Sequence, residues 1–355
     1  MKGINLIVPV NGTGYGITGK NIALELNKVA NVSLFPIGQI SGIDTQKEAD
    51  SIGKMIQNGQ LFDSYADCLR IWHQHDMSQF VGNGAKIGFP IFELDRFSDL
   101  ELHHLSNLDH IIVCSQWAKE VVVENVDHLR YDDVSVCPLG INPHRLRKTE
   151  DDLDHQVTQF FTCGKWEYRK GHDKVIQAFC MAFEEDDNVM LNVMCDNPFL
   201  TEEQTNKWKS LYLNSKMGHR VKFISRKQTH GEVLGIMSMM DCGVYLSRAE
   251  GWNLELLETM SCGVPVIATN YSGHTEFCND DNCMLVEVAD LEWAKDDKWF
   301  DGKTGKWARL DHNQVAAAAT YMAEVHREKF VNVGGITTGE HYTWENSAKR
   351  ILEYV

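Results

Sequence analysis

Residues 247–273 read SRAEGWNLELLETMSCGVPVIATNYSG, and they span the end of one predicted strand, a helix and the next strand. The first strand ends near Ser247, a turn with one glycine follows, and an amphipathic helix begins near Asn253. The apolar residues 264–268 form the second strand. Two strands joined through a helix run parallel, so this stretch predicts an α/β fold with a parallel sheet.

The same alternation of strands and helices extends over the whole chain. In the first half the predicted strands are residues 4–10, 32–36, 69–72, 87–92, 111–114 and 135–138. In the second half they are residues 160–163, 190–194, 221–224, 242–246 and 264–268. A polar, charged stretch at residues 142–159 interrupts the pattern. The segment between Trp293 and Trp307 has the glycine turns of a loop or hairpin, and we assign it no chemistry.

A chain of 355 residues favours two domains. We predict an α/β protein with two Rossmann-like βαβ domains, each built on a parallel sheet. The N-terminal domain comprises residues 1–150, and a C-terminal helix at residues 342–355 packs back on it. The C-terminal domain comprises residues 151–341.

Composition disfavours several classes of protein. The formal charge of -16 argues against nucleic acid or an anionic bilayer as a general partner. No apolar stretch reaches the roughly 18 residues of a spanning helix, and residues 4–10 are too short for a signal peptide. Ten cysteines without a Cys-x-x-Cys pair fit buried thiols in a reducing compartment. We expect a soluble, cytoplasmic protein, and leave peripheral membrane contact and the oligomeric state open.

A glycine-rich loop follows the first predicted strand. Residues 11–30 read NGTGYGITGKNIALELNKVA, in which Gly14, Gly16 and Gly19 satisfy Gly-x-Gly-x-x-Gly. Such glycines let backbone amides approach an anion at a helix N-terminus. The second predicted strand ends without the Asp or Glu that would bind an adenosine ribose, which weakens a dinucleotide interpretation. A flexible loop without a ligand is the other alternative.

Two glutamates mark the helix in residues 247–273. Glu250 lies just before the predicted helix start, where free N–H groups and the helix dipole favour a phosphate. Glu258 shares the apolar stripe of Leu254 and Leu257, so a carboxylate is placed on the face that should be buried. The paired hydroxyls of a ribose or a sugar would supply the donors that it needs. Alternatively, Glu258 caps a backbone amide or pairs with a nearby Lys or Arg.

The segment EGWNLELLE, residues 250–258, resembles the E-x7-E motif of the retaining family 4 (group 1) glycosyltransferases, which have the GT-B fold. MSCGVPVIAT, residues 260–269, resembles the continuation of that motif. The resemblance implies that Glu250 contacts the donor sugar and Glu258 the nucleotide ribose. It also implies that the sugar and diphosphate are bound by backbone amides around Trp252, Asn253 and Leu254. The family often has Pro where Glu255 stands.

A second match lies at the start of the second domain. GKWEYRKG, residues 164–171, resembles the family's Gly-Arg-x4-Lys-Gly stretch, with Lys165 in place of the Arg and Lys170 matching the Lys. The implied role of the two cations is to neutralise charge on the leaving diphosphate. Lysine keeps the charge of arginine but lacks its bidentate fork. Without the resemblance, a solvated run of charges would be the better interpretation.

Further matches lie in the first domain. In LRIWHQHDM, residues 69–77, His75 and Asp76 resemble the family's His-Asp pair, which implies contact between His75 and the donor sugar. A surface histidine is the alternative. LDHIIVCSQWAK at residues 108–119 and VSVCPLGIN at residues 134–142 resemble the family's closing strands. The resemblance covers nearly the whole chain in the expected order, and it implies a GT-B fold in which the two parallel sheets face an interdomain cleft. It also implies that residues 1–150, with the C-terminal helix, form the acceptor domain and residues 151–341 the nucleotide-sugar donor domain.

The predicted function is transfer of a sugar from a UDP- or GDP-sugar to an acceptor hydroxyl. The resemblance implies that the anomeric configuration is retained by front-face attack. Neither a metal nor another cofactor is expected. The acceptor is a glycan, a lipid-linked molecule or a small molecule, and the sequence determines neither it nor the base, the sugar or the linkage. Two rivals are an NAD-dependent oxidoreductase using the Gly14–Gly19 loop and a non-catalytic nucleotide-sugar binding protein. An epimerase on the same fold is disfavoured by EGWNLELLE.

Overall fold

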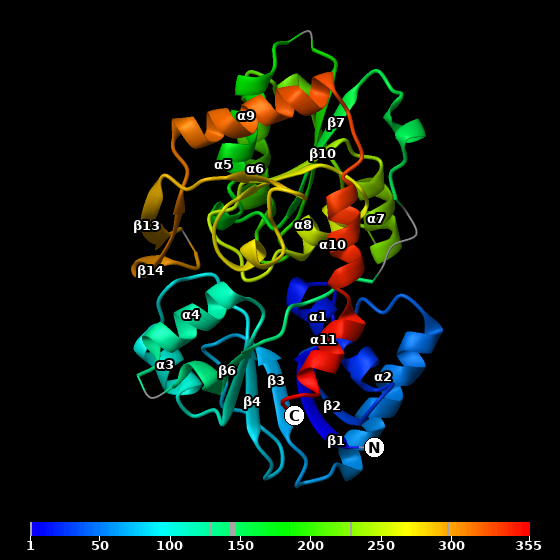
Figure 1. The fold of residues 1–355 in the computed structure, drawn as a ribbon, viewed down its shortest axis with the longest axis vertical. Helices are drawn as coiled ribbons and strands as arrows, with labels where there is room; N and C mark the ends of the chain where they lie inside the picture. Colours follow the sequence, from blue (N-terminus) through cyan, green and yellow to red (C-terminus); the bar gives the residue numbers. More distant parts are fainter. Residues whose placement is uncertain (1, 128, 143–146, 186, 228, 297) are drawn as a thin grey trace. The chain divides into compact units, whose positions relative to one another are not determined.

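The structure, a computed structural model, describes residues 2–127, 129–142, 147–185, 187–227, 229–296 and 298–355 (Figure 1). It divides into two compact units. Unit 1 comprises Met1–Asn142 and Tyr342–Val355, and unit 2 comprises Pro143–His341. Each unit contains a six-stranded parallel sheet flanked by helices, so the α/β fold class predicted from the sequence is confirmed.

Unit 1 has strands β1 (Gly3–Pro9), β2 (Asn31–Ile37), β3 (Cys68–Trp72), β4 (Lys86–Pro90), β5 (His110–Val113) and β6 (Val134–Val136). Its helices are α1 (Gly14–Leu26), α2 (Gln46–Asn58), α3 (Asp99–Leu105), α4 (Gln116–Asn125) and α11 (Trp344–Ile351). The six strands coincide with the six predicted apolar runs to within two residues at each end. Continuous apolar runs predict them because both faces of a parallel sheet are buried.

Unit 2 has strands β7 (Thr158–Gly164), β8 (Val189–Cys195), β9 (Val221–Phe223), β10 (Cys242–Tyr245), β11 (Val266–Thr269) and β12 (Met284–Val286), and a hairpin of β13 (Asp290–Lys295) and β14 (Asp301–Arg309). Its helices are α5 (His172–Ala182), α6 (Glu202–Leu213), α7 (His230–Ser238), α8 (Leu254–Ser261), α9 (His312–Arg327) and α10 (Val333–His341). The hairpin agrees with the turn signals in the sequence, whereas β12 was not predicted.

The strand order of unit 1 is β2-β1-β3-β4-β5-β6, all parallel. The chain leaves β1 toward β2 on one side and returns to β3 on the other. The loops after β1 and β3 therefore diverge at the carboxyl edge, and such a switch point is where ligands bind in open α/β sheets. The Gly14–Gly16 loop and His75 both lie at this edge.

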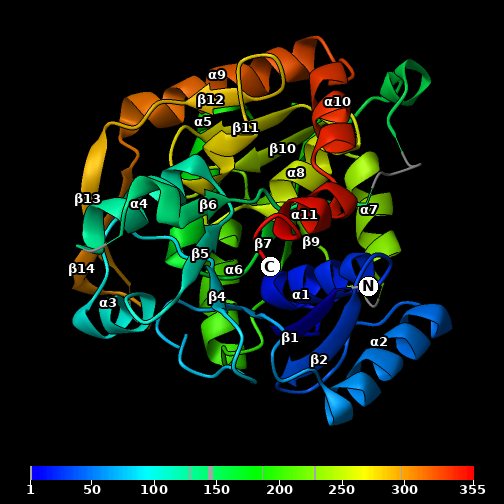
Figure 2. The ribbon, with the colours of Figure 1, turned by 60° about the horizontal axis from the view of Figure 1, so that its bottom comes forward.

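The C-terminal helix α11 packs against α1 of unit 1 (Figures 1 and 2). The chain joins this unit through a backbone bridge between Ile141 and Thr343. Gly140 permits this contact, because a Cβ atom there would lie 2.0 Å from the Thr343 carbonyl carbon. Two hydrogen bonds complete this contact. Cys137 Sγ donates to Ser347 O, and the Ser347 hydroxyl donates to Pro138 O.

The strand order of unit 2 is β12-β11-β10-β7-β8-β9, again all parallel. Phe160 and Phe161 are both fully buried, on opposite faces of β7. Phe160 packs in a core with residues of α5, α6 and α9, and Phe161 in a second core with residues of α7. The switch point of this sheet lies between β7 and β10, so the loops after these two strands meet.

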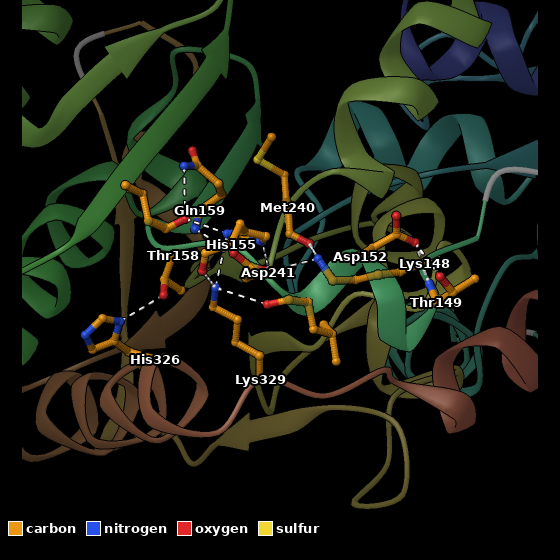
Figure 3. Close-up of polar contacts among 12 residues, drawn as sticks. Lys148, Thr149, Asp152, His155, Thr158, Gln159, Met240, Asp241, His326 and Lys329 are labelled. Atoms are coloured by element: carbon orange, nitrogen blue, oxygen red, sulfur yellow. Dashed lines mark hydrogen bonds and ion pairs between the residues drawn. The ribbon is translucent and has the colours of Figure 1, made fainter.

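A buried ion pair ties the start of unit 2 to the amino edge of its sheet (Figure 3). Lys148 Nζ lies 2.8 Å from Asp241 Oδ1 and donates a second hydrogen bond to Met240 O, and both charged side chains are 1% exposed. Asp241 also accepts from the Gln159 amide at 2.8 Å and lies 3.1 Å from His155 Nε2. We call these residues the Lys148–Asp241 cluster.

Lys329, just after α9, extends the cluster by donating to His155 O at 2.6 Å. Lys148 and Thr158 are thus buried in unit 2, although the sequence indicated only a polar crossing between domains at residues 142–159. The acidic residues between them stay exposed: Glu150, Asp151, Asp152 and Asp154. A single lysine can be buried when it finds a charged partner, which local composition does not reveal. Residues 143–146 of that stretch lie outside the described residues.

Among the described residues, no helix is long and apolar enough to cross a membrane.

Candidate active site

Two loops meet at the switch point of unit 2, one at residues 164–171 after β7 and one at residues 246–253 after β10; we call them the β7–β10 site. Their backbones touch at Gly171, where a Cβ atom would lie 1.8 Å from Leu246 O. Gly171 also has φ 69°, in the left-handed region. The Arg248 amide donates to Arg169 O at 2.7 Å, which fixes the loops against each other.

Glu250 is the buried anion of the β7–β10 site. Its Oε2 lies 2.7 Å from Arg169 Nη1, and its Oε1 lies 2.9 Å from Lys170 Nζ. Burial alone would raise the pKa of this carboxyl, but Lys170 and Arg169 outweigh burial and lower the pKa to about 2. The same pairing raises the pKa of Lys170 against the effect of its own burial. Glu250 is therefore ionised across the physiological range.

The backbone around Glu250 is held in uncommon conformations. Ser272 has φ 69° and ψ -156°, and its hydroxyl accepts a 2.8 Å hydrogen bond from the Glu250 amide. Gly273 donates to Glu250 O at 2.9 Å, and a Cβ atom at Gly273 would lie 2.0 Å from Gly251 O. A non-glycine residue with this φ is costly, and such strain is concentrated at functional sites.

Buried polar atoms gather at the carboxyl ends of β10 and β11. Within the described residues, four of them have no hydrogen-bond partner: Ser247 Oγ, Asn253 Nδ2, Thr269 Oγ1 and His274 Nδ1. His274 Nε2 donates to Thr269 O, and burial lowers the pKa of His274, so Nδ1 is an acceptor in a neutral ring. Buried polar atoms are nearly always paired, so this group indicates a polar ligand.

The N-terminus of α8 begins at this site. Asn253 has φ 79°, and its side-chain oxygen caps the Leu256 amide at 3.4 Å. The side chains of Trp252 and Leu254 are buried, and Trp252 packs on Phe277 with ring centroids 4.9 Å apart. Only the backbone of these two residues is therefore suited to contact a ligand, which is the role that the family resemblance implies.

Glu258 is buried on α8, as its place on the apolar stripe predicts. Its Oε1 lies 2.8 Å from Nε2 of His230, at the start of α7. The sequence left open a pairing with Lys or Arg, and the partner that the structure shows is a histidine. His230 was missed because nothing in the local pattern relates residue 230 to residue 258.

The two predicted cations have different surroundings. Lys170 is buried against Glu250, and its Nζ is also 3.7 Å from Glu255 Oε2. The Lys165 side chain is 40% exposed and lies 3.7 Å from Glu167 Oε1. The residue that joins Lys170 in holding Glu250 is Arg169, which lies within the quoted segment but was passed over because only Lys165 and Lys170 match the family spacing.

In unit 1 the glycine loop forms the start of α1. The Thr13 hydroxyl caps the helix by accepting from the Gly16 amide at 3.3 Å. Gly16 is required by close packing, because a Cβ atom there would lie 2.2 Å from Asn11 Oδ1. No atom lies within 4 Å of a Cβ atom built at Gly14, so Gly14 leaves its surroundings open.

His75 is exposed in a turn that follows β3. Its ring stacks on His73 with centroids 5.1 Å apart, and His73 contacts Tyr15 of the glycine loop at 4.4 Å. The loops after β1 and β3 therefore come together, as the strand order requires. Asp76 is held by the buried Arg70 at 2.9 Å, so its carboxylate has a structural partner.

A metal-binding cluster and a surface groove are two other features that could form a site. Among the described residues, no group of three or more His, Cys, Asp or Glu side chains is arranged to hold a metal ion. A groove of about 540 Å³ lies between β9 and α7, and none of the predicted site residues lines it.

Residues 147–295 match the sequence model of the family described as glycosyl transferases group 1. The matched segment is less than half of the chain. It contains both loops of the β7–β10 site, α8 and β13. The resemblance of EGWNLELLE to the group 1 glycosyltransferases is thereby confirmed at the level of this family model.

The chain is also similar to the N-acetyl-alpha-D-glucosaminyl L-malate synthase of Bacillus anthracis, with 33% identity over 123 residues. That alignment covers 34% of this chain and 30% of the Bacillus protein. Two solved structures are similar over 99% of this chain. Anabaena HepE in complex with UDP-glucose matches with 14% identity over 99% of its own chain and a TM-score of 0.71. Sucrose-phosphate synthase of Thermosynechococcus elongatus matches with 15% identity over 98% of its chain and the same TM-score.

These structures show that the GT-B fold extends over the whole chain, including unit 1, which the family model does not match.

Proposed function

We propose that this protein is a glycosyltransferase that moves a sugar from a nucleotide diphosphate sugar to an acceptor hydroxyl. The observation that carries the proposal is the β7–β10 site, where an ionised Glu250 and four unpaired buried polar atoms lie beside the N-terminus of α8. The group 1 match covers all of these residues. The complex of HepE with UDP-glucose supports a UDP-sugar as the first donor to test.

Glu250 acts as a hydrogen-bond acceptor for the hydroxyls of the donor sugar. A carboxyl with a pKa of about 2 is not protonated near neutral pH, so Glu250 cannot serve as a general acid there. Arg169 and Lys170 occupy its two oxygens, which makes it a weak nucleophile. Both points favour front-face attack with retention, in which the leaving phosphate helps to deprotonate the acceptor, over the double displacement of retaining hydrolases.

Lys170 and Lys165 stabilise the charge on the diphosphate as the glycosidic bond breaks, together with the amides at the start of α8. Positive charge in this position neutralises the diphosphate as a metal ion would, so we infer that transfer is independent of metal. Glu258 accepts hydrogen bonds from the ribose hydroxyls, and His230 orients it across a 2.8 Å contact. We also propose that Gly14 and Gly16 bind the donor, and that His75 has the catalytic role that the family resemblance implies.

The experiment is donor consumption by the purified full chain. We expect release of UDP or GDP from one member of a panel of UDP- and GDP-sugars, and slow hydrolysis even before the acceptor is known. Lys170→Met should reduce this release, whereas Lys207→Met, at an exposed position of α6, should not. Tight donor binding without any release would instead identify a non-catalytic binding protein.

Two finer points need separate measurements. Retention predicts that the anomeric configuration of the first product, observed by NMR, equals that of the donor. Metal independence predicts that EDTA leaves the rate unchanged; a rate abolished by EDTA and restored by manganese would overturn that part of the proposal.

A further inference from the structure

The β13–β14 hairpin carries three tryptophans, and neither the sequence analysis nor the proposed function uses it. Trp307 is buried, whereas Trp293 is 57% exposed and Trp299 is 51% exposed. The hairpin is attached to the β7–β10 site: the Ala308 amide donates to Arg248 O at 2.9 Å, and Trp307 packs on Tyr168 with centroids 5.9 Å apart. The hairpin therefore borders this site within unit 2.

Hydrogen bonds join Asp296 to residues 298–300 between the two strands of the hairpin. Asp296 Oδ1 accepts hydrogen bonds from the amides of Lys298, Trp299 and Phe300, and the Asp296 amide donates to Phe300 O at 3.0 Å. Phe300 points inward onto Trp307, with centroids 5.2 Å apart, while its neighbour Trp299 points outward. An aromatic ring that is already held outward loses little conformational entropy when a ligand binds.

Trp299 meets a second exposed ring. Phe199, in the loop after β8, is 56% exposed and lies edge-to-face with Trp299, with centroids 6.1 Å apart at 80°. Lys298 Nζ donates to Phe199 O and joins the two segments. On its other side Phe199 has Lys165 Nζ 5.8 Å from its ring centroid. The pair is thus continuous with the β7–β10 site through Lys165.

We propose that Phe199 and Trp299 form a subsite for a pyranose ring of the acceptor, so that the acceptor is a saccharide or carries one. This subsite of unit 2 adds to the acceptor contacts that the family resemblance implies for the N-terminal domain. This inference rests on the proposed function. The C–H face of a pyranose is apolar and flat enough to stack on an exposed indole, while its hydroxyls can bond to Lys165 and Lys298. Two rings form too small an apolar patch for a protein interface.

The position of the pair favours the acceptor over the donor. The donor sugar is assigned to the buried Glu250 and the ribose to Glu258 on α8, whereas Phe199 lies in the loop after β8 and Trp299 in the hairpin. A half-exposed platform beside Lys165 suits a ligand that arrives from solvent. A nucleobase could also stack there, and the experiment below separates the two.

The test is saturation-transfer NMR on the full chain, with disaccharides of glucose, galactose, mannose and N-acetylglucosamine as probes and UDP or GDP present. We expect ring C–H signals from at least one disaccharide. Trp299→Ala and Phe199→Ala should each weaken its apparent affinity about tenfold. Trp293→Ala is the matched control, because it removes an equally exposed tryptophan whose ring faces Lys306 on the same hairpin, and it should bind like wild type.

Binding of no disaccharide to the wild type, or equal loss in Trp293→Ala, would overturn the inference. Thermal stabilisation by UDP or GDP, measured on the same proteins, distinguishes it from the proposed function. If the nucleotide stabilises the wild type but no saccharide binds, the subsite fails and the proposed function stands. If no nucleotide stabilises the wild type, the proposed function fails. Loss of nucleotide stabilisation in Trp299→Ala would assign the pair to the nucleobase and overturn the acceptor subsite.

Discussion

At the scale of single residues, the β7–β10 site is a balanced group of charges. The cations are Lys165, Arg169 and Lys170, and the anions are Glu167, Glu250 and Glu255. Burial opposes ionisation of Glu167, but Arg169 and Lys165 outweigh it and lower its pKa. A diphosphate bound as we propose would therefore interact with Lys170 while Lys170 is still paired with Glu250. The ionisation of Glu250 then determines how firmly the Lys170 ammonium is held in place.

Replacement of Glu250 tests its role as an anion. Glu250→Gln keeps the shape of the side chain but removes its charge, so hydrogen bonds from the donor sugar weaken. We expect kcat/KM for the donor to fall about 10- to 100-fold. Glu184→Gln is the control, because Glu184 is exposed and its carboxylate forms a surface ion pair with Lys216 at 2.6 Å. Equal activity of Glu250→Gln and wild type would contradict the assignment.

The pKa of Glu250 also predicts a dependence of stability on pH. The folded-state value of about 2 is below the ordinary value of 4.5, so the pairing stabilises the fold above about pH 4.5 and is lost as pH falls toward 2. The stabilisation lost is on the order of 3 kcal/mol. Urea unfolding of wild type and Glu250→Gln across this range measures it: the difference between the two proteins should shrink on acidification, and a constant difference would disprove the linkage.

At the scale of elements, the site depends on three loops, those after β7, β10 and β11, whose backbones approach more closely than side chains allow. Gly171 lies against Leu246 O, and Gly273 lies against Gly251 O. These contacts bring Lys170 and Glu250 together, although they are distant in sequence. The loops are short and follow buried strands, so the rigid sheet sets the position of the charges.

A substitution at Gly171 should therefore be severe. Gly171→Ala places a methyl group at a left-handed φ and 1.8 Å from Leu246 O, which we expect to cost about 3 kcal/mol or more. Gly53→Ala is the matched control, since Gly53 lies within α2 with open space around it and should gain up to about 1 kcal/mol. Chemical denaturation of both variants measures the contrast; similar stabilities would refute the packing argument.

The elements also show what local sequence can predict. β7, β10 and α8 were predicted because continuous apolar runs and a stripe of period 3.6 are local properties. β12 was missed because a strand of three residues carries too little pattern. Arg169 and His230 were missed as partners of Glu250 and Glu258, because the pairing arises only when the strand order brings distant loops together. The hairpin was predicted from its turns, but its contact with Phe199 was not.

At the scale of the whole molecule, unit 2 has two clusters of charged residues at opposite edges of its sheet, and composition alone does not predict either. The Lys148–Asp241 cluster binds the entry of the chain and, through Lys329, the end of α9 to the amino edge of the sheet. The β7–β10 site lies at the opposite, carboxyl edge. Stability and function are thus assigned to different edges of one sheet, and the two can be tested separately.

Asp241→Asn should destabilise the protein without affecting the site chemistry. It leaves the buried Lys148 without its counter-ion, which we expect to cost about 3 to 5 kcal/mol in urea unfolding of the full chain. The double variant Lys148→Met with Asp241→Leu removes both charges and should recover most of this loss. A single variant as stable as wild type, or a double variant no better than the single, would contradict the description of the cluster.

The central claim is that this chain binds a nucleoside diphosphate at Glu258, and the most direct measurement is thermal stabilisation by UDP, GDP, ADP and NAD(H), comparing wild type with Glu258→Ala. A ligand at about 100 times its Kd stabilises by about 2.7 kcal/mol, which raises the apparent Tm measurably. We predict that UDP or GDP stabilises the wild type and that the effect is lost in Glu258→Ala. Stabilisation by NAD(H) alone would contradict the account and assign the ligand to the Gly14–Gly16 loop.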